Sequence, residues 1–415
     1  MRLYLMELKR ILKTRSVLIV ILGAIVLTAL LAYAPISFVR YTYQDEAGNK
    51  VKVKGLEAIK LVKAEQAEYS GIITPEMIVR ALAQYQECAG QYENGVYDEK
   101  MPVEEYNKKI APVSFIVSKL AEVYADDTTG IAAETMDLTA EEAGKFYEQC
   151  SRHLVDLMNM EQPDHPQARE KATAMYEKVE KPFAYYPGTD TNAIEYFGIM
   201  VFLMAVVGVV ITAPIFSVEY QTESDQILRC TRHGRRRLAA VKLLACFTIL
   251  TIIYAVCMTI FTVTVNSAFG WEARQTDIQF AFSAITFVEM TVGRLQMLVI
   301  GIGYLTLLAT IFFTLFLSSR LKSVFASAIT ALIFCILPIF LSNFWGGSLA
   351  EWICAILPSG GTGMGNSFLY ALLDTRFLYL GSQAFWTPCV MVAAAAVNTV
   401  LFTILTVVSY CRHRS

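Results

Sequence analysis

Residues 17–36 read VLIVILGAIVLTALLAYAPI, twenty consecutive positions without a charged side chain. A helix of this length matches the hydrocarbon core of a bilayer, which is about 30 Å thick. The chain contains five further apolar runs of comparable length, at 194–216, 243–268, 295–317, 324–345 and 388–410. The pattern therefore predicts six membrane-spanning helices.

The overall composition agrees with this prediction. Of 415 residues, 55% are hydrophobic and only 17% are charged, whereas soluble domains contain about 25% charged residues. This composition excludes a soluble globule, a disordered chain and a collagen-like chain. The net charge of −2 conceals an asymmetry, because residues 37–192 hold 27 acidic and 17 basic residues while the rest of the chain holds 10 and 18.

Every second segment between the apolar runs is rich in Lys and Arg. Such basic segments lie on the cytoplasmic side of a membrane. Several basic residues occur in 1–16, 217–242, 318–323 and 411–415, whereas 271–293 and 346–387 contain one each. With six spans, all four basic segments lie on one side of the membrane. We expect a multi-pass plasma-membrane protein with both termini in the cytoplasm and residues 37–192 outside the cell.

The first run also resembles a signal peptide, because Ala32-Tyr33-Ala34 has the form of a cleavage site. However, the apolar segment of a signal peptide is roughly 7–15 residues long, and this run is longer. Pro35 also follows directly after the position that would be cut. We therefore expect this segment to be retained as an anchor.

The external segment is expected to be mainly helical. A turn at Gly48-Asn49 predicts a small hairpin, and helical patterns cover 56–64, 77–88, 102–124, 146–160 and 166–180. Thr74-Pro75 and the capping box Thr139–Glu142 predict two of the helix starts. A shorter apolar patch before the last span, 349–357, predicts a re-entrant or interfacial helix.

The fold class is therefore an all-α polytopic membrane protein with a large extracellular insertion between spans one and two. We divide the chain into 1–36 (a cytoplasmic helix and the first span), 37–192 (the extracellular domain) and 193–415 (spans two to six). We interpret the surplus of acidic residues in this domain as solvent-exposed helix faces. The alternative interpretation is that they bind a cationic ligand or a metal. The scattered positions of its histidines, His153 and His165, argue against zinc.

The cysteines leave one question open. Cys88 and Cys150 are the pair in the predicted outer domain. They either form a disulfide or remain free, and the external Cys354 competes as a partner.

The glycine-rich segment 360–367 resembles a phosphate-binding loop, but Asn366 replaces the lysine that would reach the phosphates. We therefore interpret it as a flexible turn, and we expect no catalytic residues.

The loop between spans two and three has an ordered pattern of charges. Ser217 is placed to cap a helix that begins with Glu219, Glu223 and Asp225. Residues 231–234 then break the helix, and a basic segment begins at Arg235. This order predicts a short cytoplasmic helix between the two spans. The alternative, that the arginines only orient the protein, explains the basic residues but not the order.

This loop resembles that of the membrane subunits of ABC-2-type (type V) ABC exporters from bacteria. In that family the loop contains a Glu, then a Leu, a Thr-x-x-Gly-Arg turn and a Lys before Leu-Leu-Ala. This chain departs from the pattern at one place, because residues 221–224 stand where the family often has a small Gly after the glutamate. The resemblance implies a coupling helix, 217–242, on which an ATPase docks through Glu219, Tyr220, Glu223, Leu228, Arg229, Thr231, Arg232, Gly234, Arg235, Arg236 and Lys242. It also implies an interfacial elbow helix before the first span, which carries Glu7, Lys9, Arg10, Lys13 and Arg15.

The resemblance further implies a division of labour. A separate cytoplasmic ATPase would bind ATP and Mg²⁺, and this chain would bind no cofactor, metal or nucleic acid. Two such chains, identical or similar, would form the pathway at their interface and export a hydrophobic or amphipathic substrate, for example a peptide antibiotic. The alternative function is a membrane-anchored sensor or immunity protein whose outer domain binds a peptide without transport.

Overall fold

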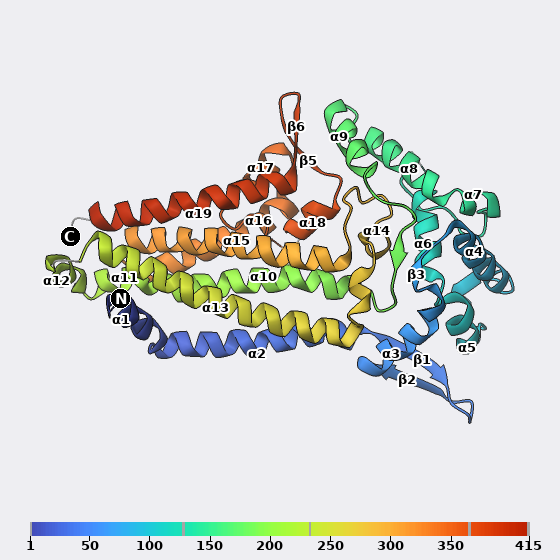
Figure 1. Cartoon of the computed structure of the whole chain (residues 1–415), viewed down its shortest axis with the longest axis horizontal. Coiled ribbons are helices and arrows are strands. Elements are labelled where there is room, and N and C mark those ends of the chain that lie inside the picture. The colour runs from blue at the N-terminus through green and yellow to red at the C-terminus, as the bar shows by residue number, and fades with distance from the viewer. Residues whose placement is uncertain (1, 127–128, 232–233, 364–366, 413–415) are drawn as a thin grey trace.

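The computed structural model describes residues 2–126, 129–231, 234–363 and 367–412. Long helices lie side by side in one bundle, and a smaller assembly of short helices and hairpins covers one end of it (Figure 1). Both chain termini lie at the opposite end of the bundle, where α1 (Arg2–Leu12) and α12 (Ser224–Cys230) are also found. The two ends are therefore built from different parts of the sequence.

The prediction of six long apolar helices is confirmed. In the described part of the chain, six helical segments are long and apolar enough to cross a membrane. They are α2 (Arg15–Phe38), α10 (Thr191–Thr212) with its continuation α11 (Pro214–Gln221), α13 (Arg236–Phe269), α15 (Val292–Arg320), α16 (Val324–Phe344) and α19 (Thr387–Arg412). The segments of α10 and α15 are 67% buried, against 22% for α2, α16 and α19, so α10 and α15 form the centre of the bundle.

The insertion between α2 and α10 is mainly helical, as predicted. It begins with the antiparallel hairpin of β1 and β2, in which Arg40 pairs with Lys54 and Gln44 with Lys50. Its elements are β1 (Arg40–Gln44), β2 (Lys50–Lys54), α3 (Leu56–Glu65), η1 (Gln66–Tyr69), β3 (Gly71–Ile72), α4 (Pro75–Ala89), η2 (Gly95–Tyr97), α5 (Val103–Glu105), η3 (Tyr106–Ile110), α6 (Ser114–Val123), α7 (Ala140–Gly144), α8 (Phe146–Glu161), α9 (Pro166–Tyr176) and β4 (Ala184–Tyr185).

Local sequence rules explain where these helices begin and end. Thr74 accepts a hydrogen bond from the Met77 amide at the start of α4, and the capping box of Thr139 and Glu142 forms as predicted. The single helix predicted over 102–124 is wrong, because the chain forms α5, a π-helical turn and α6, with a break at 111–113. Pro112 lies in that break and has no amide hydrogen to continue a helix. The last helix ends at Tyr176 and not at residue 180.

The hydrophobic core of the insertion extends beyond residues 37–192. Phe280 and Phe287, from the segment between α13 and α15, pack in the same cluster as Phe146 and Phe183. So does Phe377, from the hairpin that precedes α19. These additional segments contain η4 (Glu272–Gln275), α14 (Ile278–Ala281), β5 (Phe377–Leu380) and β6 (Gln383–Trp386). Three stretches of the chain therefore build one core at this end of the bundle.

Two further predictions concern the region before the last span and the cysteines. The short apolar helix forms as α17 (Ser348–Ile356), followed by α18 (Phe368–Leu373), and its re-entrant character stays a prediction. Residues 364–366 of the glycine-rich turn lie outside the described residues. The disulfide considered for Cys88 and Cys150 is not formed, because both thiols are free and buried in different hydrophobic clusters.

The insertion meets the bundle at Gly188. This residue has φ +100°, and a Cβ there would lie 2.1 Å from the carbonyl oxygen of Phe269, the last residue of α13. Such a distance is far inside van der Waals contact. The close approach of these two backbones therefore requires glycine.

We predict that Gly188→Ala destabilises the protein more than Gly71→Ala. Gly71 has a similar φ of +113°, but a Cβ there would contact nothing within 4 Å. Both variants incur a backbone cost of about 1–2 kcal/mol, and Gly188→Ala adds about 1–3 kcal/mol for the steric clash. Thermal unfolding of the detergent-purified protein measures the difference. Equal melting temperatures for the two variants would contradict the assigned contact.

Candidate functional site

The predicted loop between spans two and three lies at the end of the bundle that also holds both termini (Figure 1). Here α10 stops at Thr212, and α11 continues in its place from Pro214 to Gln221. Pro214 cannot donate the backbone hydrogen bond that a continuous helix needs. Ser318 of α15 bonds to the interrupted backbone: its Oγ accepts from the amides of Phe216 (3.0 Å) and Ser217 (3.1 Å) and donates to Ala213 O (2.6 Å).

The prediction that Ser217 caps a helix is wrong. Ser217 lies inside α11 and its hydroxyl donates to Ala213 O at 2.7 Å. The next helix, α12, instead begins after Glu223, whose backbone is left-handed with φ +54°. The acidic segment therefore forms a helical end, a tight turn and a second short helix.

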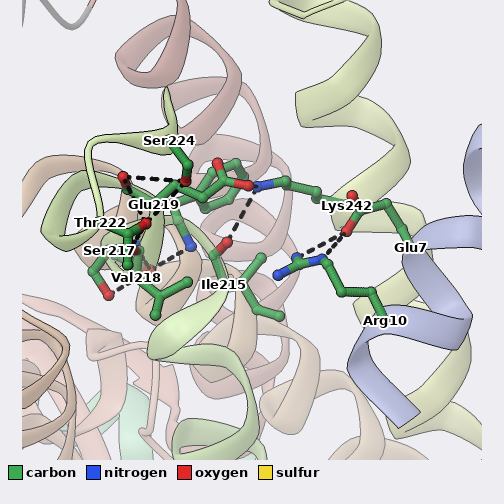
Figure 2. Close-up of polar contacts among 11 residues, drawn as sticks. Glu7, Arg10, Ile215, Ser217, Val218, Glu219, Thr222, Ser224 and Lys242 are labelled. Carbon is green, nitrogen blue, oxygen red and sulfur yellow. Dashed lines mark hydrogen bonds and ion pairs between the residues drawn. The ribbon is translucent and has the colours of Figure 1, made fainter. Parts of the chain in front are cut away.

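A buried ion pair joins this segment to span three. The Lys242 ammonium contacts Glu219 Oε1 and donates to Ile215 O at 3.2 Å (Figure 2). Its side chain has no exposed surface, and that of Glu219 is 7% exposed. The ammonium also lies 4.9 Å from the ring centre of Phe216. Since an unpaired buried charge is costly, each of these two residues holds the other in place.

Two further helices converge on α11. The Tyr220 hydroxyl donates to Ser319 O of α15 at 3.1 Å, and Ser409 of α19 donates to the same carbonyl at 3.3 Å. Tyr410 packs its ring 5.0 Å from that of Phe216. The position of α11 is thus fixed from α13, α15 and α19 together.

The turn after α12 explains the spacing of Leu228, Thr231 and Gly234. The amide and the hydroxyl of Thr231 both donate to Leu228 O, at 3.2 and 2.7 Å, and the Gly234 amide donates to Thr231 O at 3.1 Å. A Cβ on Gly234 would lie 1.7 Å from Leu228 O. Only glycine fits this turn, which directs the chain back into α13.

A helix, α1, forms where the elbow helix is predicted, and it lies against the same end of α13. Tyr4 donates to Thr248 Oγ1 at 2.9 Å, and the buried Glu7 is paired with Arg10 at 2.8 Å (Figure 2). Lys9 is exposed on α1, Lys13 lies in the turn that follows, and Arg15 begins α2. Both α1 and α11 therefore contact the first turns of α13.

The structure divides the predicted docking residues into two groups. Glu219, Tyr220, Gly234 and Lys242 are buried and cannot touch a docked protein in this conformation. The exposed members are Glu223, Thr231, Arg235 and Arg236, with Leu228 half-buried. Arg232 lies outside the described residues, and of Arg229 only the backbone is described.

Sequence reasoning missed the residues that hold this segment from the other spans. Ser318 and Ser319 come from the end of α15, and Ser409 and Tyr410 from the end of α19. No motif in the sequence singles out these four residues for this role. Only the packing of α15 and α19 against α11 reveals it.

We predict strong coupling between Glu219 and Lys242 in a double-mutant cycle. Glu219→Gln and Lys242→Met each leave one buried charge unpaired, at a cost of about 3–5 kcal/mol. The double variant removes both charges, so it should be less destabilised than the sum by at least about 1 kcal/mol. Thermal unfolding of the four proteins in detergent measures the coupling. Additive changes would show that the pair does not act as a unit.

The chain matches a known protein family. A family model described as ABC-2 family transporter protein matches residues 1–412, which is nearly the whole chain. No curated protein matches the chain closely enough to count as a relative. The match includes α1, the segment from α11 to α13, and all six apolar helices. The chain therefore belongs to the ABC-2 family of transporters, whose permeases are membrane subunits without catalytic activity of their own.

Proposed function

We propose that this chain is the permease subunit of an ATP-binding-cassette exporter, and that its ATPase docks on α12 and the turn that follows. The observation that carries the proposal is the division between exposed and buried residues in this segment. Glu223, Thr231, Arg235 and Arg236 are exposed at the tip, while Glu219 and Lys242 are buried directly behind them. The first group is available to a partner, and the second group is placed to transmit its movement.

The mechanical argument follows from the contacts of α11. A push on α12 by the ATPase moves α11, because only Thr222 and Glu223 separate the two helices. The ion pair to Lys242 passes the movement to α13, and the bonds to Ser318 and Ser319 pass it to α15. In this proposal, nucleotide-driven closure of the ATPase rearranges three spans. ATP and Mg²⁺ are bound by the ATPase and not by this chain.

The orientation follows from the basic segments. Residues 1–16 and 217–242 are rich in Lys and Arg and lie at one end of the bundle, which we assign to the cytoplasm. The insertion at the other end is then extracellular, and the protein lies in the plasma membrane. Its net negative charge favours cationic substrates among the hydrophobic and amphipathic ones, such as peptide antibiotics.

The proposed working unit contains two permeases. A pathway between two identical or similar chains agrees with the large exposed apolar faces of α2, α16 and α19. Lateral access from the lipid to such an interface suits amphipathic molecules.

We predict that Arg235→Glu with Arg236→Glu abolishes co-purification with the cognate ATPase while membrane insertion is retained. Reversing two exposed charges replaces attraction by repulsion at the proposed docking surface. The matched control is Arg320→Glu with Lys322→Glu, which changes the charge equally at the last residue of α15 and in the loop that follows it. The control should retain the ATPase. Undiminished recovery with the first pair would refute docking at this site.

A second prediction tests the orientation. Cys230 is exposed on α12, and Tyr97 of the insertion is 90% exposed. In a chain whose other cysteines are replaced by alanine, a membrane-impermeant maleimide should label Tyr97→Cys in intact cells. Cys230 should react only after the cells are permeabilised. The reverse pattern would place the insertion in the cytoplasm.

A further inference from the structure

A groove in the membrane-spanning surface separates α13 from α15. Its volume is about 480 Å³, and its walls include Met258 and Val263 of α13 and Ile300 and Gly301 of α15. The tyrosine hydroxyl groups beside it are already bonded within the protein: Tyr254 donates to Ile300 O at 2.7 Å, and Tyr304 lies 2.6 Å from Thr251 Oγ1. The groove is therefore suited to an apolar chain.

A second cavity lies at the insertion end of the same two helices. Its volume is about 640 Å³, and it is lined by Trp271, Arg274 and Arg294, among others. Met297 lines both this cavity and the apolar groove, so the two adjoin at that side chain. The result is one elongated site with two cationic residues at one end and an apolar trough at the other.

Both arginines are without a carboxylate partner among the described residues. Within the described ranges, no carboxylate forms an ion pair with Arg274 or Arg294, and Arg274 Nε is buried without a hydrogen-bond acceptor. The Arg274 guanidinium is 5.4 Å from the ring centre of Trp271. It also packs over Gly293, where a Cβ would be 3.3 Å from Nε. A positioned but unpaired guanidinium is ready to bind an anion.

The location of these arginines is unusual for this end of the bundle. Between α13 and α15 the loop 271–291 has a single basic residue, Arg274, and Arg294 follows on the first turn of α15. A tryptophan beside them is typical of the membrane–water interface. The groove residues from Thr251 to Val263 precede the end of α13 at Phe269 by 6 to 18 positions, or about 9–27 Å along the helix. The trough thus runs from the headgroup level into the hydrocarbon core.

We propose that this site binds an anionic phospholipid, with its phosphate between Arg274 and Arg294 and one acyl chain in the groove between α13 and α15. Charge complementarity selects the headgroup, and the apolar trough selects a lipid over a free phosphate. The bound chain fills the space between the span tied to Glu219 and the span that carries Ser318. The proposal uses the membrane-spanning helices and is independent of where an ATPase docks.

The test is native mass spectrometry of the detergent-solubilised full chain titrated with phosphatidylglycerol or phosphatidylcholine. The wild-type protein should bind phosphatidylglycerol in preference. Arg274→Gln with Arg294→Gln should lower the affinity for phosphatidylglycerol by about tenfold and leave that for phosphatidylcholine unchanged. Arg376→Gln is the matched control, because Arg376 lies at the same end of the bundle but is paired with Asp374 at 2.8 Å.

A second variant tests the apolar half of the site. A Cβ on Gly301 would contact nothing within 4 Å, and Gly301 lines the groove, so Gly301→Leu should occupy part of the groove and lower retention of both lipids. The melting temperature of each variant without added lipid verifies its fold. The proposal is overturned if the double arginine variant keeps wild-type preference, or if glycerol 3-phosphate binds as tightly as the lipid. The proposal is also overturned if Gly301→Leu changes the oligomeric state but leaves lipid binding unchanged. That result would show that a second copy of this chain occupies the groove.

Discussion

The Lys242 ammonium is a full charge with no exposed surface, and Glu219 is the carboxylate placed to neutralise it. Desolvating both groups is expensive, and this cost is recovered only while α11 stays against α13. The pair therefore holds α11 against α13. The break at Pro214, the bonds of Ser318 to the freed amides and the packing of Phe216 on Tyr410 are all arranged around it. Such a pair restricts α11 to very few positions, which is a property that a flexible surface loop lacks.

Much of the architecture could be predicted because each rule involved acts locally. Apolar runs of bilayer length identify the six long helices, Thr74 and Thr139 identify two helix starts, and the Gly48 turn identifies the hairpin. Pro112 is an instructive exception: the helical pattern continues across it, but the missing amide interrupts the helix. The spacing of hydrophobic residues shows which face of a helix would be apolar. It carries no information about the loss of a single backbone hydrogen bond.

The site was predicted less completely, and for a physical reason. Charge order located Glu219 and Lys242, but it could not distinguish a charged residue that faces a partner from one that is buried against its own chain. That distinction depends on the end of α15 and the end of α19, which are about 100 and 190 residues further along the sequence. Gly234 is the opposite case, because its requirement for glycine arises from Leu228 and Thr231 in the same turn.

The core at the insertion end has a consequence for how such proteins diverge. Phe280, Phe287 and Phe377 lie outside the insertion in sequence but inside its hydrophobic core. An insertion transplanted from a relative would lose these three aromatic neighbours and expose the surface that they cover. Chimeras that exchange this region must carry the loop before α15 and the hairpin before α19 as well. The three segments are therefore expected to change together during evolution, as a single inherited unit distributed over the chain.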